Sequence, residues 1–506
     1  MPENNCIVNL VNFVRACEPR LPMDLFQPVK DEMEMAKEYG LPVTWLLQYD
    51  ALTEGPFVEY LKKEMPPTHE VGIWFEIVQA NAEAAGLEWK GRYPWDWHVN
   101  CGFSVGYTPE ERERIADVFL AEFKKTFGFF PASVGSWFFD AHLLAYLHDR
   151  YGIRAACNCK DQYGTDGYTL WGGYWANAYY PSRVNSYMPA QTAACQIDVP
   201  VFRMLGSDPL DQYDCGTEGG NGQGVITLEP VYEGGGGNPA WVDWFFRETF
   251  REPHFAMAYA QAGQENSFGA KRITKPLRAQ CAKIAALRDA GKIRAETLEA
   301  SGTWFRKNFP VTPVTAQITL DDVNGTGRSG IWYLSRFQRL NFYRGTDGTL
   351  RIRDWHVFAE RYEERFLRTV CPSSVCAYHV PAVADGFLWD PCGIRIGTGG
   401  AAKLENVRGE GGEVLCFTCG GAAIRCTPDS LHAEFADESG GMTFYFNAAR
   451  MADAGAVLDV REKELAFSWD GISYGVTAER GLFRLRGGEV EFVPEQRQLS
   501  LKTYVR

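Results

Sequence analysis

Long apolar runs and an export signal are both missing from this 506-residue sequence. No stretch of 18 consecutive apolar residues is present, which argues against a membrane-spanning helix. The N-terminal stretch MPENNCIVNLVNFV lacks the basic segment with which signal peptides begin, and its apolar run is short. We therefore expect a cytoplasmic protein with no membrane association, in which the 14 cysteines stay reduced.

Histidine is scarce, and the common catalytic signatures are absent. The eight histidines never occur at the HxxxH or HExxH spacing that seeds a metal site. The close cysteine pairs CNC (157–159) and CFTC (416–419) have no second pair at zinc-finger spacing. A GxSxG elbow, a GxGxxG after a strand and a Walker loop are also missing. We expect no metal and no cofactor.

Positive charge is in deficit. The chain has 51 Lys and Arg against 64 Asp and Glu, for a net charge of -13. Such a balance argues against binding to nucleic acid or to an anionic membrane, and an acidic ligand would need local arginines. Hydrophobic residues make up 45% of the chain, which is enough for large cores in two domains.

Apolar strands and amphipathic helices alternate in the first two thirds of the chain. Eight strands are expected, in the segments CIVNLVNFV, LPVTWLLQYDAL, HEVGIWFEIV, ASVGSWFF, IRAACNC, CQIDVPVFRML, HFAMAYAQAG and VTAQITL. Near-continuous apolar strands separated by helices indicate a parallel sheet. We predict an α/β fold with a (β/α)8-type barrel over residues 1–345, whose active site lies at the carboxyl ends of the strands.

Short alternating strands with glycine turns follow the barrel, as in EVLCFTCGG and ELAFSWDGISYGVT. They predict a C-terminal antiparallel β-sandwich-like domain over residues 346–506. Two barrel connections, 160–195 and the glycine-rich 206–238, are unusually long. Long loops on a barrel often carry function, although the second could equally be a flexible flap.

Polar and aromatic side chains cluster where the barrel strands end, and they form our candidate binding set. Arginines could hold the carboxylate of an acidic sugar, and tryptophan could stack on a sugar ring. The set comprises Arg15, Arg203, Trp97, His98, Tyr163, Asp166, Glu265, Asn266 and Asn341. Core packing or surface ion pairs would explain several of these positions equally well.

An Asp-x-His pair stands at a seam between strand and helix, in GSWFFDAH (135–142). In an extended segment Asp140 and His142 would face the same side. The carboxylate would then raise the basicity of the imidazole, so that His142 could take a proton from water. The alternative is that Asp140 merely caps the following helix, a common place for aspartate.

The segment THEVGIWFE and the polar end of the first strand resemble the superfamily of sugar deacetylase and glycoside hydrolase barrels. The metal-dependent deacetylases of that superfamily carry paired aspartates and an HxxxH, which are absent here. The Asp-x-His pair resembles glycoside hydrolase family 156, the inverting exo-sialidases. That resemblance implies a barrel with a C-terminal β domain, a homodimer, and a sialoside as substrate.

The resemblance also implies catalytic roles. His142 and Asp140 would activate water, and Glu18 in ACEPR would protonate the leaving oxygen, although the family uses aspartate there. Three alternatives stay open: another metal-free hydrolase for a uronic or neutral sugar, a metal-dependent polysaccharide deacetylase, and a non-catalytic sugar-binding protein.

Overall fold

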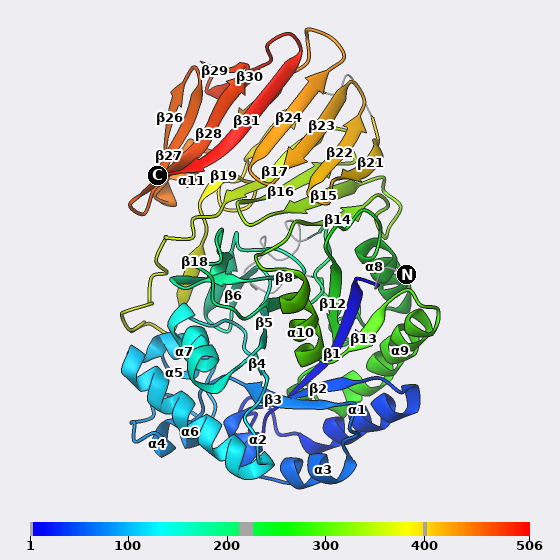
Figure 1. Cartoon of the computed structure of the whole chain (residues 1–506), viewed down its shortest axis with the longest axis vertical. Coiled ribbons are helices and arrows are strands. Elements are labelled where there is room, and N and C mark those ends of the chain that lie inside the picture. The colour runs from blue at the N-terminus through cyan, green and yellow to red at the C-terminus, as the bar shows by residue number, and fades with distance from the viewer. Residues whose placement is uncertain (1–3, 212–225, 398–401) are drawn as a thin grey trace.

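The computed structural model describes residues 4–211, 226–397 and 402–506, and Figure 1 shows a helix-covered sheet with antiparallel sheets above it. The first sheet is mostly parallel, and its leading strands are fully buried. Seven strands run parallel in the spatial order β12-β1-β2-β3-β4-β5-β11. They are β1 (Cys6–Val14), β2 (Val43–Leu47), β3 (Glu70–Trp74), β4 (Ser133–Gly135), β5 (Ala155–Cys159), β11 (Val201–Met204) and β12 (Ala258–Ala262). Seven of the eight strands expected from the sequence therefore form this sheet.

The sheet nearly closes into a barrel, but not as a regular (β/α)8 barrel. Beside β11 stands β8 (Ala178–Tyr179), which runs antiparallel, while β13 (Arg294–Glu296) pairs with β1. Asn177 spans the remaining gap between β11 and β12. Its carbonyl oxygen accepts from the N–H of Arg203 at 2.9 Å, and its Oδ1 accepts from the N–H of Tyr259 at 2.8 Å. The hydrogen bonds of one asparagine thus link β11 to β12 in place of a backbone ladder between the two strands.

Helices follow most of the parallel strands. The long α6 shows why they form where the sequence predicts them. Thr108 and Glu111 exchange side-chain and backbone hydrogen bonds in a capping box, and Gly128 ends the helix in a left-handed conformation. The helices of this part are α1 (Phe26–Tyr39), α2 (Tyr49–Thr53), α3 (Phe57–Glu64), α4 (Gln79–Ala84), α5 (Val99–Gly102), η1 (Ser104–Gly106), α6 (Pro109–Phe127), α7 (Ala141–Tyr151), α8 (Pro239–Thr249), η2 (Asn266–Phe268), α9 (Ala270–Asp289) and α10 (Leu298–Asn308).

The long connection after β5 forms a small structure of its own. It contains β6 (Gln162–Thr165), β7 (Tyr168–Trp171), β9 (Pro181–Ser182) and β10 (Asn185–Pro189). The strand β18 (Cys376–His379), from much later in the chain, pairs in parallel with β7. The C-terminal part of the chain therefore holds this connection in place at the end of the barrel.

The eighth expected barrel strand, in VTAQITL, belongs to a different sheet. As β14 (Thr315–Thr319) it pairs antiparallel with β15, so the antiparallel sheet begins before residue 345, the end expected for the barrel. This sheet runs in the order β14, β15 (Ser329–Leu334), β16 (Gln338–Arg344), β17 (Leu350–Val357), β20 (Gly393–Ile396), β25 (Met442–Tyr445), β30 (Glu489–Val493) and β29 (Leu482–Arg486), with β19 (Ala382–Asp385) beside β17. Composition could not separate an apolar parallel strand from a buried antiparallel one.

A second antiparallel sheet shares a hydrophobic core with the antiparallel sheet that begins at β14. The rings of Phe342 and Phe417, one from each sheet, meet edge to face at 4.9 Å. Its order is β21 (Leu404–Glu410), β22 (Val414–Cys419), β23 (Ala422–Thr427), β24 (Ser430–Phe435), β31 (Gln498–Val505), β28 (Ile472–Arg480), β27 (Glu464–Trp469) and β26 (Val457–Arg461), and α11 (Ala448–Asp453) lies between β25 and β26 in the chain. The expected β-rich C-terminal part is thus present as two packed sheets.

Within the described residues, no helix is both long enough and apolar enough to cross a membrane.

Candidate functional site

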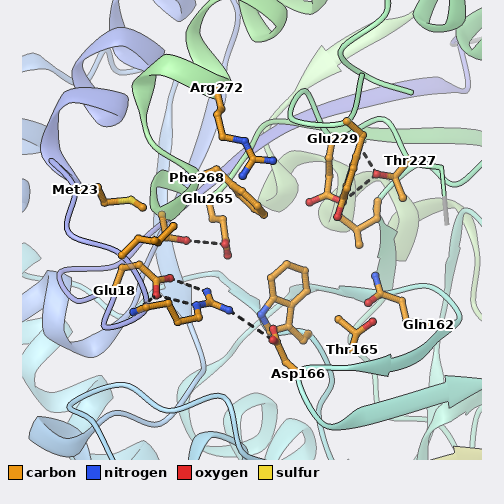
Figure 2. A pocket seen from close by; sticks show the side chains of 16 residues that line it. Glu18, Met23, Gln162, Thr165, Asp166, Thr227, Glu229, Glu265, Phe268 and Arg272 are labelled. Atoms are coloured by element: carbon orange, nitrogen blue, oxygen red, sulfur yellow. Dashed lines mark hydrogen bonds and ion pairs between the residues drawn. The ribbon is translucent and has the colours of Figure 1, made fainter. Parts of the chain in front are cut away.

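A pocket of about 260 Å3 opens at the carboxyl ends of the barrel strands (Figure 2). That volume is just below the usual range of small-molecule sites, about 300–1,000 Å3, so the pocket suits a small ligand. Its walls come from the segments after β1, β4, β5, β11 and β12 and from the start of α9. The residues that line it are Glu18, Arg20, Leu21, Met23, Trp137, Gln162, Thr165, Asp166, Leu205, Thr227, Glu229, Tyr232, Glu265, Ser267, Phe268 and Arg272.

A buried ion-pair cluster lies behind the pocket. The Nη2 atom of Arg15 lies 2.9 Å from Oε2 of Glu76 and 3.1 Å from Oε2 of Glu265, and its guanidinium lies 4.0 Å from the ring centre of Trp95. Burial opposes the charge of Arg15, but the two carboxylates outweigh it and raise the arginine pKa. Burial also raises the pKa of Glu76 to about 7, although Arg15 opposes that rise. The Arg15 guanidinium is therefore paired within the protein, and it holds the Glu265 carboxylate in position on the side away from the pocket.

Two carboxyl groups in the pocket have contrasting surroundings. Burial raises the pKa of Glu229 to about 7, against the hydrogen bonds that it accepts from Gln264 and Thr227. Glu265, in contrast, contacts Arg15 and accepts a 2.6 Å hydrogen bond from the hydroxyl of Ser267. A carboxyl whose pKa is raised to about 7 therefore shares the pocket with one held by a cation, as in pairs of catalytic acids and bases.

Glu18 is locked to its neighbour Arg20. The Arg20 guanidinium donates to both oxygens of Glu18, at 2.8 and 2.6 Å, and the Arg20 backbone N–H donates at 2.9 Å. Burial alone would raise the pKa of Glu18, but these bonds lower it. Glu18 does line the pocket, yet its ionised form is stabilised, so the expected role as a proton donor is not supported by its surroundings.

Asp166 is the other acidic residue predicted at the mouth, and it lines the pocket as expected. With a φ of 44°, it forms the two-residue turn between β6 and β7 together with Gly167, and Asp-Gly is a preferred pair in such hairpin turns. Burial raises its pKa, and Arg20 lies 3.7 Å away across the pocket. Asp166 is a candidate functional position because it lines the pocket.

Arg272, from the first turn of α9, is the cation in the pocket that has no carboxylate partner within the described residues. Its guanidinium lies 5.1 Å from the ring centre of Phe268. Figure 2 shows Arg272 and Phe268 on one side of the pocket, facing Asp166, Gln162 and Thr165 on the other. An exposed guanidinium of this kind can pair with a carboxylate of the ligand.

The Asp140–His142 dyad does not form. Asp140 is fully buried, caps α7 through the N–H of Leu143 at 2.9 Å, and pairs with Arg112 at 3.0 Å. His142 is 30% exposed and its Nε2 lies 3.0 Å from a carboxylate oxygen of Glu113. The helix begins at Ala141, so the two side chains point in different directions and not to the same side as in a strand. Neither lines the pocket.

Three other predicted residues lie away from the pocket. Arg203 is buried and donates to Oδ1 of Asn158 at 2.5 Å and to the hydroxyl of Tyr187 at 3.3 Å. Asn341 lies in β16 of the antiparallel sheet and accepts from Arg353 at 3.1 Å. Arg15 is paired with Glu76 and Glu265. The structure does not support the expected carboxylate clamp of Arg15 and Arg203, because both side chains are buried, bond to internal partners and do not line the pocket.

The remaining candidates surround the pocket without lining it. Trp97 and the adjacent His98 precede α5, and Arg20 lies 5.2 Å from the Trp97 ring centre. Tyr163 is 46% exposed and contacts Phe387 edge to face. Asn266 is buried, and its amide exchanges hydrogen bonds with the backbone of Arg15. It has a positioning role: it ties the end of β1 to the segment after β12.

Sequence reasoning missed Glu229 and Arg272. Glu229 stands in ITLEPVYEGGGG, inside the glycine-rich connection 206–238, for which the sequence favours a functional loop and a flexible flap equally. Residues 212–225 of that connection lie outside the described residues. Arg272 belongs to a helix whose composition looks ordinary. A search for acidic residues in every connection that follows a barrel strand would have found Glu229.

Among the described residues, the pocket offers no imidazole or thiolate ligand for a zinc-type metal ion. The pocket is lined by carboxylates, amides and arginines and by no histidine. Over residues 4–211, 226–397 and 402–506, no group of three or more His, Cys, Asp or Glu side chains is placed to hold one.

Comparisons with known proteins support the fold. No protein-family model and no curated protein matches the chain. A solved structure described as a putative glycoside hydrolase/deacetylase from Parabacteroides distasonis aligns with a TM-score of 0.55 at 16% identity, over 75% of this chain and 91% of that one. A putative polysaccharide deacetylase from Mycobacterium smegmatis aligns with a TM-score of 0.37 at 12% identity, over 61% of this chain and 92% of that one. The first likeness shows a shared barrel-like fold, and no comparison points to a sialidase.

Proposed function

We propose that the protein is a glycoside hydrolase that cleaves a terminal acidic sugar in the pocket at the barrel mouth. The observation that carries this proposal is the contrast between Glu229 and Glu265. Burial raises the pKa of Glu229 to about 7, whereas Glu265 is paired with a cation. Glycoside hydrolysis needs such a pair, because one carboxyl must donate a proton and the other must act as a carboxylate.

Glu229 is the proposed general acid. Its carboxyl proton goes to the glycosidic oxygen as the bond from that oxygen to the anomeric carbon breaks. The hydrogen bonds from Gln264 and Thr227 hold the carboxyl in place. This assignment replaces Glu18, whose ionised form is stabilised by Arg20.

Glu265 is the proposed second carboxylate, and Arg15 and Ser267 orient it. In an inverting reaction it would take a proton from the attacking water, and in a retaining reaction it would bond to the anomeric carbon itself. The two routes release opposite anomers first, so the product separates them.

Arg272 is the proposed anchor for the substrate's negative charge. It is the pocket arginine without a carboxylate partner among the described residues, whereas Glu18 neutralises Arg20. Sialic and uronic acids both carry a ring carboxylate that a guanidinium can bind with two hydrogen bonds.

A panel of glycosides tests the proposal. The wild-type protein should release the aglycone from an aryl sialoside or an aryl glucuronide, and release it much more slowly from the neutral aryl glucoside. Glu265→Gln should lower the rate on the acidic substrate by about 10²–10⁴-fold. Glu122→Gln, which removes a surface carboxylate on α6 that pairs with Lys125, is the matched control and should act like the wild type. Full activity of Glu265→Gln would refute the assignment, and binding without release would indicate a sugar-binding protein.

A further inference from the structure

A second hollow lies on the first antiparallel sheet and shares no lining residue with the pocket at the barrel mouth. It encloses about 830 Å3 and its lining includes Tyr343, Arg351, Arg353, Arg395, Tyr445 and Arg450. We call it the arginine groove. Strand alternation explains its position. Ile352 and Ile394 point into the core between the two sheets, so their neighbours Arg351 and Arg395 point to the opposite face.

The strand register brings the arginines together. Arg351 of β17 stands directly opposite Arg395 of β20. Arg353 is the extra residue of a β-bulge in β17, a feature that redirects a side chain. Like charges placed opposite each other on neighbouring strands destabilise a sheet. A pairing of this kind indicates that the face is built to meet negative charge.

The groove is positive although the protein as a whole has a net charge of -13. Its lining holds four arginines against two carboxylates, Asp347 and Asp390. Arg351 pairs with Asp347 at 2.6 Å, and Arg395 pairs with Glu489 at 2.6 Å. Arg450 is exposed and pairs with no carboxylate in the described part of the chain. The arginines of the groove therefore outnumber its carboxylates, and the excess positive charge can attract an anionic ligand.

Aromatic rings line the same hollow. The guanidinium of Arg353 lies 4.1 Å from the ring centre of Tyr343, and that of Arg395 lies 4.5 Å from the ring centre of Tyr445. Gly393 makes room for Tyr445, because a Cβ atom there would lie 2.8 Å from the tyrosine hydroxyl. The groove thus offers flat rings beside charged planar groups.

The hollow continues into a second one of about 920 Å3, with which it shares Asp347, Thr349 and Arg395. The continuation is lined by four carboxylates and three arginines, so the excess of positive charge is confined to the arginine groove. An extended groove suits a chain-like ligand better than a single small molecule, and guanidinium groups pair with carboxylates along such a chain.

We propose that the arginine groove is an accessory binding site for an acidic polysaccharide chain, with carboxylates of successive uronic acid units paired to Arg395 and Arg450. The anionic character of the ligand follows from the groove itself. The choice of a sugar chain rests on the proposed function, since an accessory site would hold the polymer from which the barrel removes terminal units.

Binding of oligogalacturonate to the full-length Glu265→Gln variant, measured by calorimetry, tests the proposal without hydrolysis of the probe. Arg395→Gln combined with Arg450→Gln should weaken binding at least about tenfold, as expected when charge-assisted hydrogen bonds are lost. The matched control combines Arg408→Gln with Arg425→Gln on the other sheet, because neither arginine lines the groove or its continuation. It should bind like its parent.

Three results would overturn the proposal: unchanged binding by the Arg395 and Arg450 double variant, equal binding of a neutral cello-oligosaccharide, or equal displacement of the probe by an RNA oligomer. The outcome is separate from the hydrolase proposal. If the groove binds the probe and the protein hydrolyses no glycoside, the groove proposal stands and the hydrolase proposal fails. If the protein hydrolyses an acidic glycoside and the groove does not bind the probe, the hydrolase proposal stands and the groove proposal fails.

Discussion

Glu229 governs the expected pH dependence at the scale of single residues. Its pKa of about 7 means that it carries its proton below that pH and loses it above. The value of kcat/KM should therefore fall as pH rises through about 7, because the general acid must be protonated to act. Glu229→Gln should lower the rate on an alkyl glycoside by about 10²–10⁴-fold and affect a nitrophenyl glycoside less, since nitrophenolate leaves without a proton. A rate that increases through pH 7 would contradict the assignment.

Asp140 and His142 should differ in what their replacement changes. Asp140→Ala leaves Arg112 buried without its carboxylate partner, and loss of one partner of a buried pair costs about 3–5 kcal/mol of unfolding free energy. His142→Ala removes a partly exposed side chain and should change stability by about 0.5 kcal/mol or less, with turnover unchanged. Thermal melts and turnover of both variants check this. A stable, inactive His142→Ala protein would restore the dyad.

The residues at the mouth were predictable where a rule about strand ends applied. Glu18, Asp166 and Glu265 follow β1, β5 and β12, and all three line the pocket. The dyad failed because it depended on where the helix starts, and a shift of one residue decides which side a side chain faces. Partners far along the chain, such as Arg112 for Asp140, leave no trace in local sequence.

At the scale of elements, α1 contains a buried carboxyl that should weaken the fold. Both oxygens of Glu32 lack a hydrogen-bond partner among the described residues, and burial raises its pKa well above the usual value. Glu32→Met should raise the free energy of unfolding by about 1–3 kcal/mol, the cost of burying an unpaired polar group. The matched control is Glu34→Met, on the exposed side of the same helix.

The gain from Glu32→Met should be larger at pH 8 than at pH 5. A carboxyl whose pKa is raised by folding keeps its proton in the folded state, whereas the unfolded chain releases it above about pH 4.3. The stability of the wild type therefore falls as pH rises above that value, and the variant lacks this loss. Denaturant unfolding at the two pH values measures the difference, and an equal gain at both would count against the buried carboxyl as its cause.

Elements with their own end signals were predictable and the others were not. The capping box, the proline and the final glycine fix α6 from the sequence alone. The apolar segments identified seven barrel strands, but β14 has the same composition and joins the antiparallel sheet. Which sheet a buried strand joins depends on its partners, and β8, only two residues long, carries no sequence signal at all.

At the scale of the whole molecule, one arginine joins the barrel to the antiparallel sheets. Arg339 of β16 pairs with both oxygens of Asp354, and its Nη1 lies 2.7 Å from Asp161, just after β5. All three side chains are fully buried. Arg339→Met should lower the free energy of unfolding by about 3–5 kcal/mol, because two buried carboxylates lose their partner. Arg486→Met, at an exposed ion pair with Glu491, should cost about 1 kcal/mol or less. Equal effects of the two variants would show that the buried cluster does not join the parts.

NMR of the sugar released from one acidic glycoside, followed for the wild type, Glu229→Gln and His142→Ala under the same conditions, tests the central claim most directly. We predict that the wild type and His142→Ala release the same anomer first, at similar rates, and that Glu229→Gln is slower by about 10²–10⁴-fold. Normal release by Glu229→Gln together with a comparable loss in His142→Ala would contradict the claim that catalysis takes place between Glu229 and Glu265.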